Sequence, residues 1–134
     1  MRVADFIVQY LKNKNIKTFF SVTGRGTLFL NDALARDKNI KSFFFHHEQS
    51  AAFAAITTPN VTGNISCCMV STGCASTNTI TAVLSAWQDS LPVIFISGQN
   101  FLNETTTFKK KKNIRTYGQQ EANIIEIIKP ITKY

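Results

Sequence analysis

Residues 65–97 read ISCCMVSTGCASTNTITAVLSAWQDSLPVIFIS: an apolar run, a short polar turn, a helical pattern and a second apolar run. The runs Ile65–Val70 and Pro92–Ile96 are apolar on both faces, which is typical of strands buried between two layers of helices. The segment between them, Thr77–Trp87, predicts a helix. A strand, a helix and a second strand in this order indicate a parallel βαβ unit.

The same alternation of strands and helices extends along the rest of the chain. We expect strands at Lys17–Val22 and Ile40–His46, and helices at Val3–Leu11, Leu30–Leu34, Glu48–Thr57 and Gln120–Ile128. A turn is expected at Pro59–Asn60 and Gly63–Asn64, and a loop at Asn100–Tyr117. The predicted fold class is α/β, an open, doubly wound, mainly parallel sheet with helices on both faces. At 134 residues the chain has room for a single domain, residues 1–134.

The last residues, Pro130–Tyr134, are apolar and carry no stop signal. Natural termini are usually polar and frayed. We therefore expect either a short final strand here or, as the interpretation we favour, a domain that is truncated at this point and belongs to a longer protein.

Composition narrows the class of protein. With 44% hydrophobic and 17% charged residues the chain is typical of globular proteins. It has neither an apolar run of about 20 residues nor a signal-peptide pattern, so we expect a cytoplasmic protein without a membrane partner. Cys67, Cys68 and Cys74 form no CxxC pair, and no histidine stands at metal-ligand spacing. We expect free thiols and no metal site.

The formal net charge of +7 raises the question of nucleic acid. Four of the basic residues form one run, Lys109–Lys112, which is expected to be a solvated loop. No basic stripe interleaved with aromatic residues occurs, and no nucleic-acid-binding motif is found. We therefore expect no nucleic-acid partner.

Ligands of such a sheet bind beyond the carboxyl ends of the strands, in the loops that lead to the helices. The sequence offers four of these loops: Thr23–Gly26, His46–Glu48, Ser71–Ser76 and Gly98–Asn100. Most of the polar and ionisable candidates lie there. The four loops together are therefore the predicted ligand site.

Two phosphate-binding patterns can be tested against these loops. A GxGxxG pattern would start at Gly24, but its third glycine position holds Phe29, and no Walker lysine pattern occurs. Ser71–Ser76 precedes a predicted helix, so it could hold a phosphate at a helix N-terminus or merely supply N-cap residues. The residues leave that choice open.

Glu48 is the most informative ionisable residue in these loops. It lies between Phe43–Phe45 and Ala51–Phe53, and such apolar neighbours would desolvate its carboxylate and favour its use as a proton donor. The alternative is an ordinary acidic residue in the first turn of a helix. His46 and His47 face opposite sides of an extended segment, so at most one can point toward the site. A structural, hydrogen-bonded imidazole is expected for either.

Four segments, taken in chain order, resemble thiamine-diphosphate enzymes, especially the large subunit of acetolactate synthase. They are SVTGRGTLFLNDAL (Ser21–Leu34), FFFHHEQSAAFAA (Phe43–Ala55), STGCASTNTITAVLSAWQDSLPVIFISGQ (Ser71–Gln99) and TYGQQEANIIEIIKPITKY (Thr116–Tyr134). They are similar to that family's glycine loop, its strand–Glu–helix segment, its Gly-Pro-Gly-Ala-Thr-Asn turn with the following helix and strand, and a segment that ends near an active-site lysine. Several motifs in the family's order are far more specific than any one of them.

The resemblance implies a PYR domain, which binds the aminopyrimidine ring of thiamine diphosphate. A separate PP domain, absent from this chain, would hold the diphosphate and Mg²⁺. Glu48 would hydrogen-bond N1′ of the ring and promote removal of the C2 proton, so that a 2-oxo acid can be attacked and decarboxylated. The further residues implied are Val22, Thr23, Gly24, Thr72, Gly73, Cys74, Asn78 and Gln120 at the cofactor, and Gln119 and Lys133 at the substrate.

The resemblance also implies partners. In the family the cofactor lies between the PYR domain of one subunit and the PP domain of another, so a homodimer or homotetramer with exposed apolar surface is expected. FAD remains a possible second cofactor. As an isolated domain, the chain is expected to be inactive.

This sequence departs from the family's pattern at several positions. Cys74 replaces the usual proline of the turn, Arg25 a glycine, and Gln119 an aromatic residue, while Ile56–Asn60 stands in place of a Tyr-Ala-Arg ending. The first three leave Glu48 intact but put the substrate in doubt. Acetolactate-synthase-like carboligation is therefore the leading hypothesis, with a 2-oxo-acid decarboxylase, another carboligase or a non-catalytic scaffold as alternatives.

Overall fold

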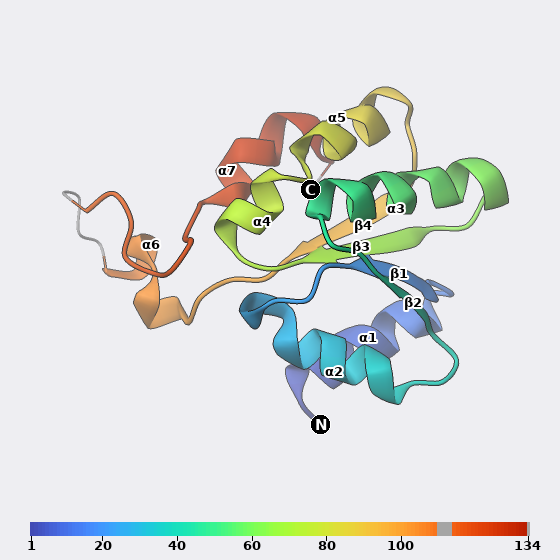
Figure 1. Ribbon diagram of the computed structural model, residues 1–134, viewed down its shortest axis with the longest axis horizontal. Coiled ribbons are helices and arrows are strands. Elements are labelled where there is room, and N and C mark those ends of the chain that lie inside the picture. Colours follow the sequence, from blue (N-terminus) through green and yellow to red (C-terminus); the bar gives the residue numbers. More distant parts are fainter. Residues whose placement is uncertain (110–113, 134) are drawn as a thin grey trace.

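The centre of the molecule is a four-stranded sheet in the order β2-β1-β3-β4, with every neighbouring pair parallel (Figure 1). The structure is a computed structural model and describes residues 1–109 and 114–133. The strands are β1 (Thr18–Ser21), β2 (Lys41–Phe44), β3 (Ser66–Val70) and β4 (Val93–Ser97). The predicted open parallel sheet is confirmed, and each strand lies within two residues of its predicted bounds.

Helices cover both faces of the sheet, which confirms the doubly wound prediction (Figure 1). The α-helices are α1 (Val3–Asn13), α2 (Leu28–Arg36), α3 (Glu48–Thr62), α4 (Gly73–Thr77), α5 (Ile80–Gln88), α6 (Thr106–Lys109) and α7 (Ile124–Ile128). The described residues also form the short 3-10 helices η1 (Arg25–Thr27), η2 (Leu102–Glu104) and η3 (Lys129–Ile131). Helices α1 and α2 lie on one face, and α3 and α5 on the other.

Two hydrophobic cores form because successive strand residues point to opposite faces. On β1, Phe19 packs with α1 and α2, whereas Phe20 packs with α3 and α5. On β3, Cys67 and Cys68 divide in the same way, and both are fully buried free thiols, as predicted. Because each face of the sheet has its own core, the strands are fixed and the loops at their carboxyl ends are held in place.

The prediction of a turn at Pro59–Asn60 is wrong, because α3 continues through Pro59 to Thr62. A proline inside a helix leaves the carbonyl four residues earlier, here that of Ala55, without its usual N–H donor. The hydroxyl of Ser66 on β3 donates to that carbonyl oxygen at 2.6 Å. A partner from the next strand thus replaces the missing bond, and the helix ends only at Gly63, whose φ is 70°.

The C-terminal segment differs most from its predicted structure. The predicted loop Asn100–Tyr117 contains η2 and α6, although its residues Lys110–Lys112 lie outside the described part. The predicted helix Gln120–Ile128 begins only at Ile124, because Gln120 adopts a left-handed φ of 55° that no helix accommodates. Residues 129–131 form η3 rather than the beginning of a final strand.

The predicted helix Thr77–Trp87 is divided. Helix α4 ends at Thr77, and α5 begins at Ile80 after a turn in which the Thr79 N–H donates to the Ser76 carbonyl. The Thr79 hydroxyl donates to the same carbonyl at 2.7 Å. A threonine that bonds to the preceding turn in this way competes with regular helix, which explains the break.

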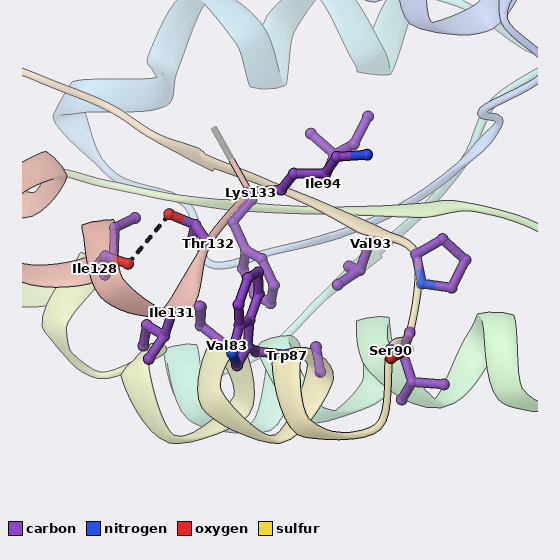
Figure 2. Close-up of a pocket in the computed structure, with 13 residues that line it drawn as sticks. Val83, Trp87, Ser90, Val93, Ile94, Ile128, Ile131, Thr132 and Lys133 are labelled. Atoms are coloured by element: carbon purple, nitrogen blue, oxygen red, sulfur yellow. Dashed lines mark hydrogen bonds between the residues drawn. The ribbon is translucent and has the colours of Figure 1, made fainter.

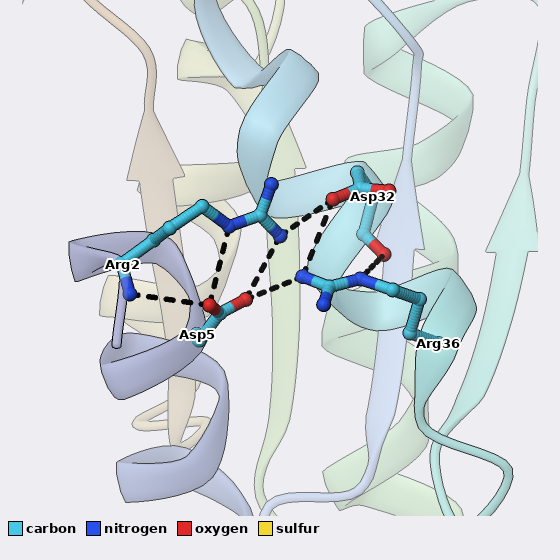
Figure 3. A network of polar contacts seen from close by, with 4 residues as sticks. All are labelled: Arg2, Asp5, Asp32 and Arg36. Carbon is cyan, nitrogen blue, oxygen red and sulfur yellow. Dashed lines mark hydrogen bonds and ion pairs between the residues drawn. The ribbon is translucent and has the colours of Figure 1, made fainter.

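A group of four charged side chains joins α1 to α2 (Figure 3). Arg2 pairs with Asp5 at 2.9 Å and with Asp32 at 2.5 Å, while Arg36 pairs with Asp5 at 2.5 Å and with Asp32 at 3.3 Å. The four side chains are partly exposed, so each pair contributes little to stability by itself. Their alternation in sign fixes how the two helices lie against each other at this end.

Candidate functional site

The loops that follow the four strands enclose a cavity of about 490 Å³. It lies where ligands of open parallel sheets bind. Six of the predicted site residues line it: Thr23, Gly24, Glu48, Thr72, Gln119 and Gln120. The structure thus brings residues far apart in the sequence to one place.

Glu48 is the first residue of α3 and reaches the cavity from the end of β2. Asn78, in the turn between α4 and α5, donates from its amide nitrogen Nδ2 to Glu48 Oε2 at 2.8 Å. Among the described residues, no donor bonds to the second oxygen, Oε1. The carboxylate is therefore held at one oxygen and available at the other.

Neither histidine of this loop lines the cavity. His47 is the N-cap of α3, and its ring nitrogen Nδ1 accepts a hydrogen bond from the Gln49 N–H at 3.2 Å. This satisfies one of the N–H groups that a helix start leaves without a partner. The expected structural, hydrogen-bonded role is confirmed for His47.

The apolar niche expected around Glu48 is only partly formed within this chain. Its side chain is half-buried, and Phe43 and Phe44 remain 48% and 52% exposed. In the core, burial and to a lesser degree the negative charge of Glu48 raise the pKa of the Cys68 thiol to about 12. Cys68 therefore stays a neutral thiol in the core and is not a nucleophile for the site.

Ser71, directly after β3, ties the loops of three strands together. Its hydroxyl accepts the Gly26 N–H at 3.2 Å, and its carbonyl accepts the Ser76 hydroxyl at 3.0 Å. The Ser76 hydroxyl also bonds to that of Ser97 at the end of β4. A Cβ on Gly24 would come within 2.5 Å of the Ser71 Cβ, so only glycine allows this approach. This network fixes the walls of the cavity before any ligand binds.

Gly73 belongs to the site through its backbone rather than as a lining residue. It has a φ of 31°, and a Cβ there would lie 1.5 Å from the carbonyl oxygen of Gln120. The segment that carries Gln119 and Gln120 can therefore pack directly onto the start of α4. Val22 and Cys74 do not line the cavity; Val22 packs into the core, and the Cys74 side chain is exposed.

Comparison with known protein families shows the family to which this chain belongs. Residues 1–127 match the family described as thiamine pyrophosphate enzyme, N-terminal TPP binding domain. This chain belongs to the thiamine pyrophosphate enzymes.

Its similar proteins include acetolactate synthases from distant organisms. One from Mycobacterium leprae is 32% identical over 131 residues, which is 98% of this chain and 20% of the relative. Acetolactate synthase 1 of Zea mays and the acetolactate synthase large subunit of Haemophilus influenzae are each 30% identical over 98% of this chain, and over 19% and 21% of their own lengths. The chain spans about a fifth of the length of the curated relatives it matches.

The cavity has features that fit the pyrimidine part of thiamine diphosphate, the cofactor implied by the thiamine pyrophosphate enzyme family. Its volume of about 490 Å³ suits a small organic ligand. The side chains Leu28, Phe29 and Ala75 offer apolar wall, and Glu48 offers a hydrogen-bond acceptor. Within residues 1–109 and 114–133, no group of three His, Cys, Asp or Glu side chains could hold a metal ion.

Lys133 lies apart from the cavity of this thiamine pyrophosphate enzyme domain. It lines a different, mostly apolar cavity of about 600 Å³ between α5, β4 and η3 (Figure 2). Trp87, Val93 and Ile131 are among the walls of that cavity. The geometry therefore gives no support to the predicted role of Lys133 in substrate binding.

Several lining residues of this domain were not predicted individually. They are Arg25, Gly26, Leu28, Phe29, Ser71, Ala75, Gln99, Asn100, Phe101 and Glu104. Most lie in or directly beside the loops recognised from the strand pattern, so their proximity to the site could have been inferred. Phe101 and Glu104 could not, because the path of residues 100–109 depends on contacts with residues 117–121.

The described helices include none with the length and apolar character that a membrane span requires.

Proposed function

We propose that this chain forms the pyrimidine-binding part of an enzyme that decarboxylates a 2-oxo acid and joins the product to a second carbonyl compound, in the manner of an acetolactate synthase. The observation that carries this proposal is the Glu48 carboxylate at the wall of the cavity, bonded to Asn78 at one oxygen only. The similarity to acetolactate synthases over 98% of the chain supports it.

The proposed role of Glu48 follows from its two oxygens. Asn78 can only donate from Nδ2, so it favours a Glu48 Oε2 without a proton. Proton exchange is then left to Oε1, which would bond to a ring nitrogen of the cofactor. When bound, thiamine diphosphate supplies an acidic C2–H and an electron sink for decarboxylation. The task of Glu48 is to hold or release a proton at Oε1.

The proposed substrate side of the cavity is polar. Gln119 and Gln120 project amide side chains from the segment that packs on Gly73. Amides can donate to the carboxylate and carbonyl oxygens of a 2-oxo acid without adding charge. We therefore propose that Gln119 contacts the substrate and that Gln120 contacts the cofactor.

The remaining parts of the proposed active site lie outside this chain. Mg²⁺ and the diphosphate would be held by the PP domain of a partner subunit, within a homodimer or homotetramer. Partial exposure of Glu48, Phe43 and Phe44 supports this, because a second surface placed over them would complete the apolar niche. A cytoplasmic location belongs to the same proposal, and FAD remains a possible additional cofactor.

The test uses the full-length protein that carries this chain, with Glu48→Gln as the variant and Glu126→Gln as the matched control. Glu126 is an exposed residue of α7 outside the cavity, so the control makes the same chemical change elsewhere. With pyruvate, thiamine diphosphate and Mg²⁺, the parent and the control should form acetolactate. Glu48→Gln should lower kcat by about 100-fold or more, the usual contribution of a proton-transfer group.

The products separate the alternatives. Free acetaldehyde in place of acetolactate would indicate a decarboxylase. A parent protein that binds no thiamine diphosphate in a calorimetric titration would indicate a scaffold domain and overturn the proposal.

A further inference from the structure

We infer that Glu121 is a positioning residue: its carboxylate fastens residues 117–121, here called the glutamine segment, to the start of α6 and so sets where Gln119 and Gln120 stand in the cavity. The inference rests on the proposed function, in which that cavity holds the cofactor and the substrate. It assigns a task to a side chain that does not itself line the cavity.

Each oxygen of the Glu121 carboxylate accepts two hydrogen bonds. Oε1 accepts from the backbone N–H and the hydroxyl of Thr106, both at 2.7 Å. Oε2 accepts from the N–H groups of Tyr117 and Gly118, at 2.9 and 3.1 Å. One side chain thus joins the first residue of α6 to two residues of the glutamine segment, and these two parts of the chain lie on either side of residues 110–113 in the sequence.

Only an ionised carboxylate satisfies all four donors. A glutamine of the same shape would turn its NH₂ group toward two N–H donors or toward Thr106, because an amide has one accepting atom. Burial raises the pKa of Glu121, but hydrogen bonds from the Tyr117 and Thr106 N–H groups outweigh it and lower that pKa to about 2. The four donors therefore favour the ionised form of the Glu121 carboxylate.

The opposite side of the glutamine segment is equally confined. Asn100 donates from Nδ2 to the Gln119 carbonyl at 3.0 Å, and a Cβ on Gly118 would lie 2.7 Å from the Glu104 carbonyl oxygen. The Gln120 carbonyl lies against Gly73, and Gln120 itself has a φ of 55°. A residue in this strained conformation persists only where its surroundings determine it. Glu121 provides the charged part of those surroundings.

The consequence concerns the two glutamine side chains. The glutamine segment has no regular helix or strand to hold it, and both glutamines are exposed toward the cavity. Their positions depend on Asn100 and Gly73 on one side and Glu121 on the other. Without the carboxylate, the segment would keep its contacts with α4 and η2 but lose its attachment to α6.

Glu121→Gln tests the inference, with Glu126→Gln as the control. The first measurement is amide hydrogen exchange of the full-length protein. We expect exchange at Thr106, Tyr117 and Gly118 to become at least about tenfold faster in Glu121→Gln, as expected when hydrogen bonds to a charged group are lost. The control should leave these amides unchanged. Unchanged exchange in Glu121→Gln would overturn the inference.

The second measurement is a crystal structure of the Glu121→Gln variant without ligand, which should show Gln119 and Gln120 displaced from the cavity wall. If both keep their positions, Glu121 is not a positioning residue even where exchange rises. Should Glu121→Gln fail to fold, Thr106→Val removes one of the four donors and must give a smaller rise in exchange at Tyr117 and Gly118. No rise there would also overturn the inference.

A titration with thiamine diphosphate separates this inference from the proposed function. If the parent protein binds the cofactor, Glu121→Gln should raise its dissociation constant or the KM for the 2-oxo acid, with a smaller effect on kcat. If the parent binds no cofactor, the proposed function fails, while exchange and the crystal structure still decide the role of Glu121.

Discussion

The hydrogen bond between Asn78 and Glu48 is the contact on which the proposed chemistry depends most. It joins the turn after α4 to the first residue of α3, and it fixes one oxygen of the carboxylate at 2.8 Å. Asn78 does not line the cavity itself, so it acts on the site through Glu48. The resemblance predicts that Asn78 lies beside the cofactor, and in the structure Asn78 reaches the cavity wall through the Glu48 side chain.

Asn78→Ala should therefore weaken catalysis without unfolding the protein. With its Oε2 no longer fixed, the Glu48 side chain can rotate, and kcat should fall by about tenfold, the effect of losing one hydrogen bond to a partly exposed charged group. Asn64→Ala is the control, since Asn64 is exposed and lies in the turn after α3. Equal activity of the two variants would contradict a positioning role for Asn78.

The hydroxyl of Ser66 supports α3 at its internal proline. Ser66→Ala would leave the buried Ala55 carbonyl without a partner, which should lower the free energy of unfolding by about 1–3 kcal/mol in urea denaturation. Ser50→Ala, on the exposed side of α3, should change it little.

A double-mutant cycle isolates this contact. In the background Pro59→Ala, residue 59 regains an N–H that can bond to the Ala55 carbonyl, so Ser66→Ala should cost less there than in the parent. Equal costs in both backgrounds would show that the Ser66 hydroxyl does not replace the bond that proline removes.

At the scale of elements, the strands were predictable from their apolar runs, most clearly the central strand β3, whose residues are all buried. Ile65–Val70 and Pro92–Ile96 gave β3 and β4 within one residue at each end. The errors lie where a distant partner decides the outcome. Nothing local to Pro59 shows that Ser66 will rescue α3, and nothing local to Thr106 shows that Glu121 will bond to the start of α6.

The residues of the candidate site likewise separate into those that the strand pattern locates and those that depend on distant contacts. Loops at the carboxyl ends of parallel strands could be located from the strand pattern, and with them Thr23, Glu48 and Thr72. The resemblance supplied Gln119 and Gln120, whose approach depends on the glycine at position 73. Lys133, which the resemblance also suggested, does not line this cavity; it follows a helix and a 3-10 helix whose path no periodicity reveals.

The glutamine segment should be sensitive to acid. The pKa of Glu121 is about 2 in the folded protein, below its ordinary value of 4.5, so its carboxylate stabilises the segment above about pH 4.5 and this stabilisation is lost as the pH falls toward 2. Limited proteolysis between about pH 5 and pH 2 should show increasing cleavage at residues 114–121. In Glu121→Gln the cleavage should be greater at pH 5 and depend less on pH. A parallel pH dependence in both proteins would contradict this assignment.

At the scale of the whole molecule, apolar surface remains on both sides of the sheet. Trp87 on α5 is 49% exposed, and Phe43 and Phe44 form part of the edge strand β2. Exposed apolar side chains of this size often mark surfaces that pair with other proteins. This agrees with the expectation that the active enzyme is assembled from more than one subunit.

The full-length protein should accordingly sediment as a dimer or tetramer in analytical ultracentrifugation. Trp87→Glu places a charge on an exposed apolar position and should leave the fold intact, since the residue is not part of either buried core. The distribution between oligomers is then expected to shift toward smaller species if α5 lies at an interface. A monomer at all concentrations for the parent protein would contradict the expected assembly.

The charged group that joins α1 to α2 should matter little beyond local packing. Arg36→Ala removes the pairs of Arg36 with Asp5 and Asp32, and the free energy of unfolding should fall by less than about 1 kcal/mol at low salt. The loss should shrink further at about 1 M salt because exposed charges are screened. A larger loss of unfolding free energy that salt does not reduce would contradict the weak, solvent-screened pairing expected for these partly exposed side chains.

The central claim is that the Glu48 carboxylate handles a proton for bound thiamine diphosphate. The most direct measurement is the rate at which solvent deuterium enters C2 of the bound cofactor, followed by acid quench and proton NMR in the parent protein, Glu48→Gln and Glu126→Gln, each at saturating cofactor. The parent and Glu126→Gln should exchange at the same rate, with Glu48→Gln slower by about 100-fold or more. An unchanged rate in saturated Glu48→Gln would contradict the claim.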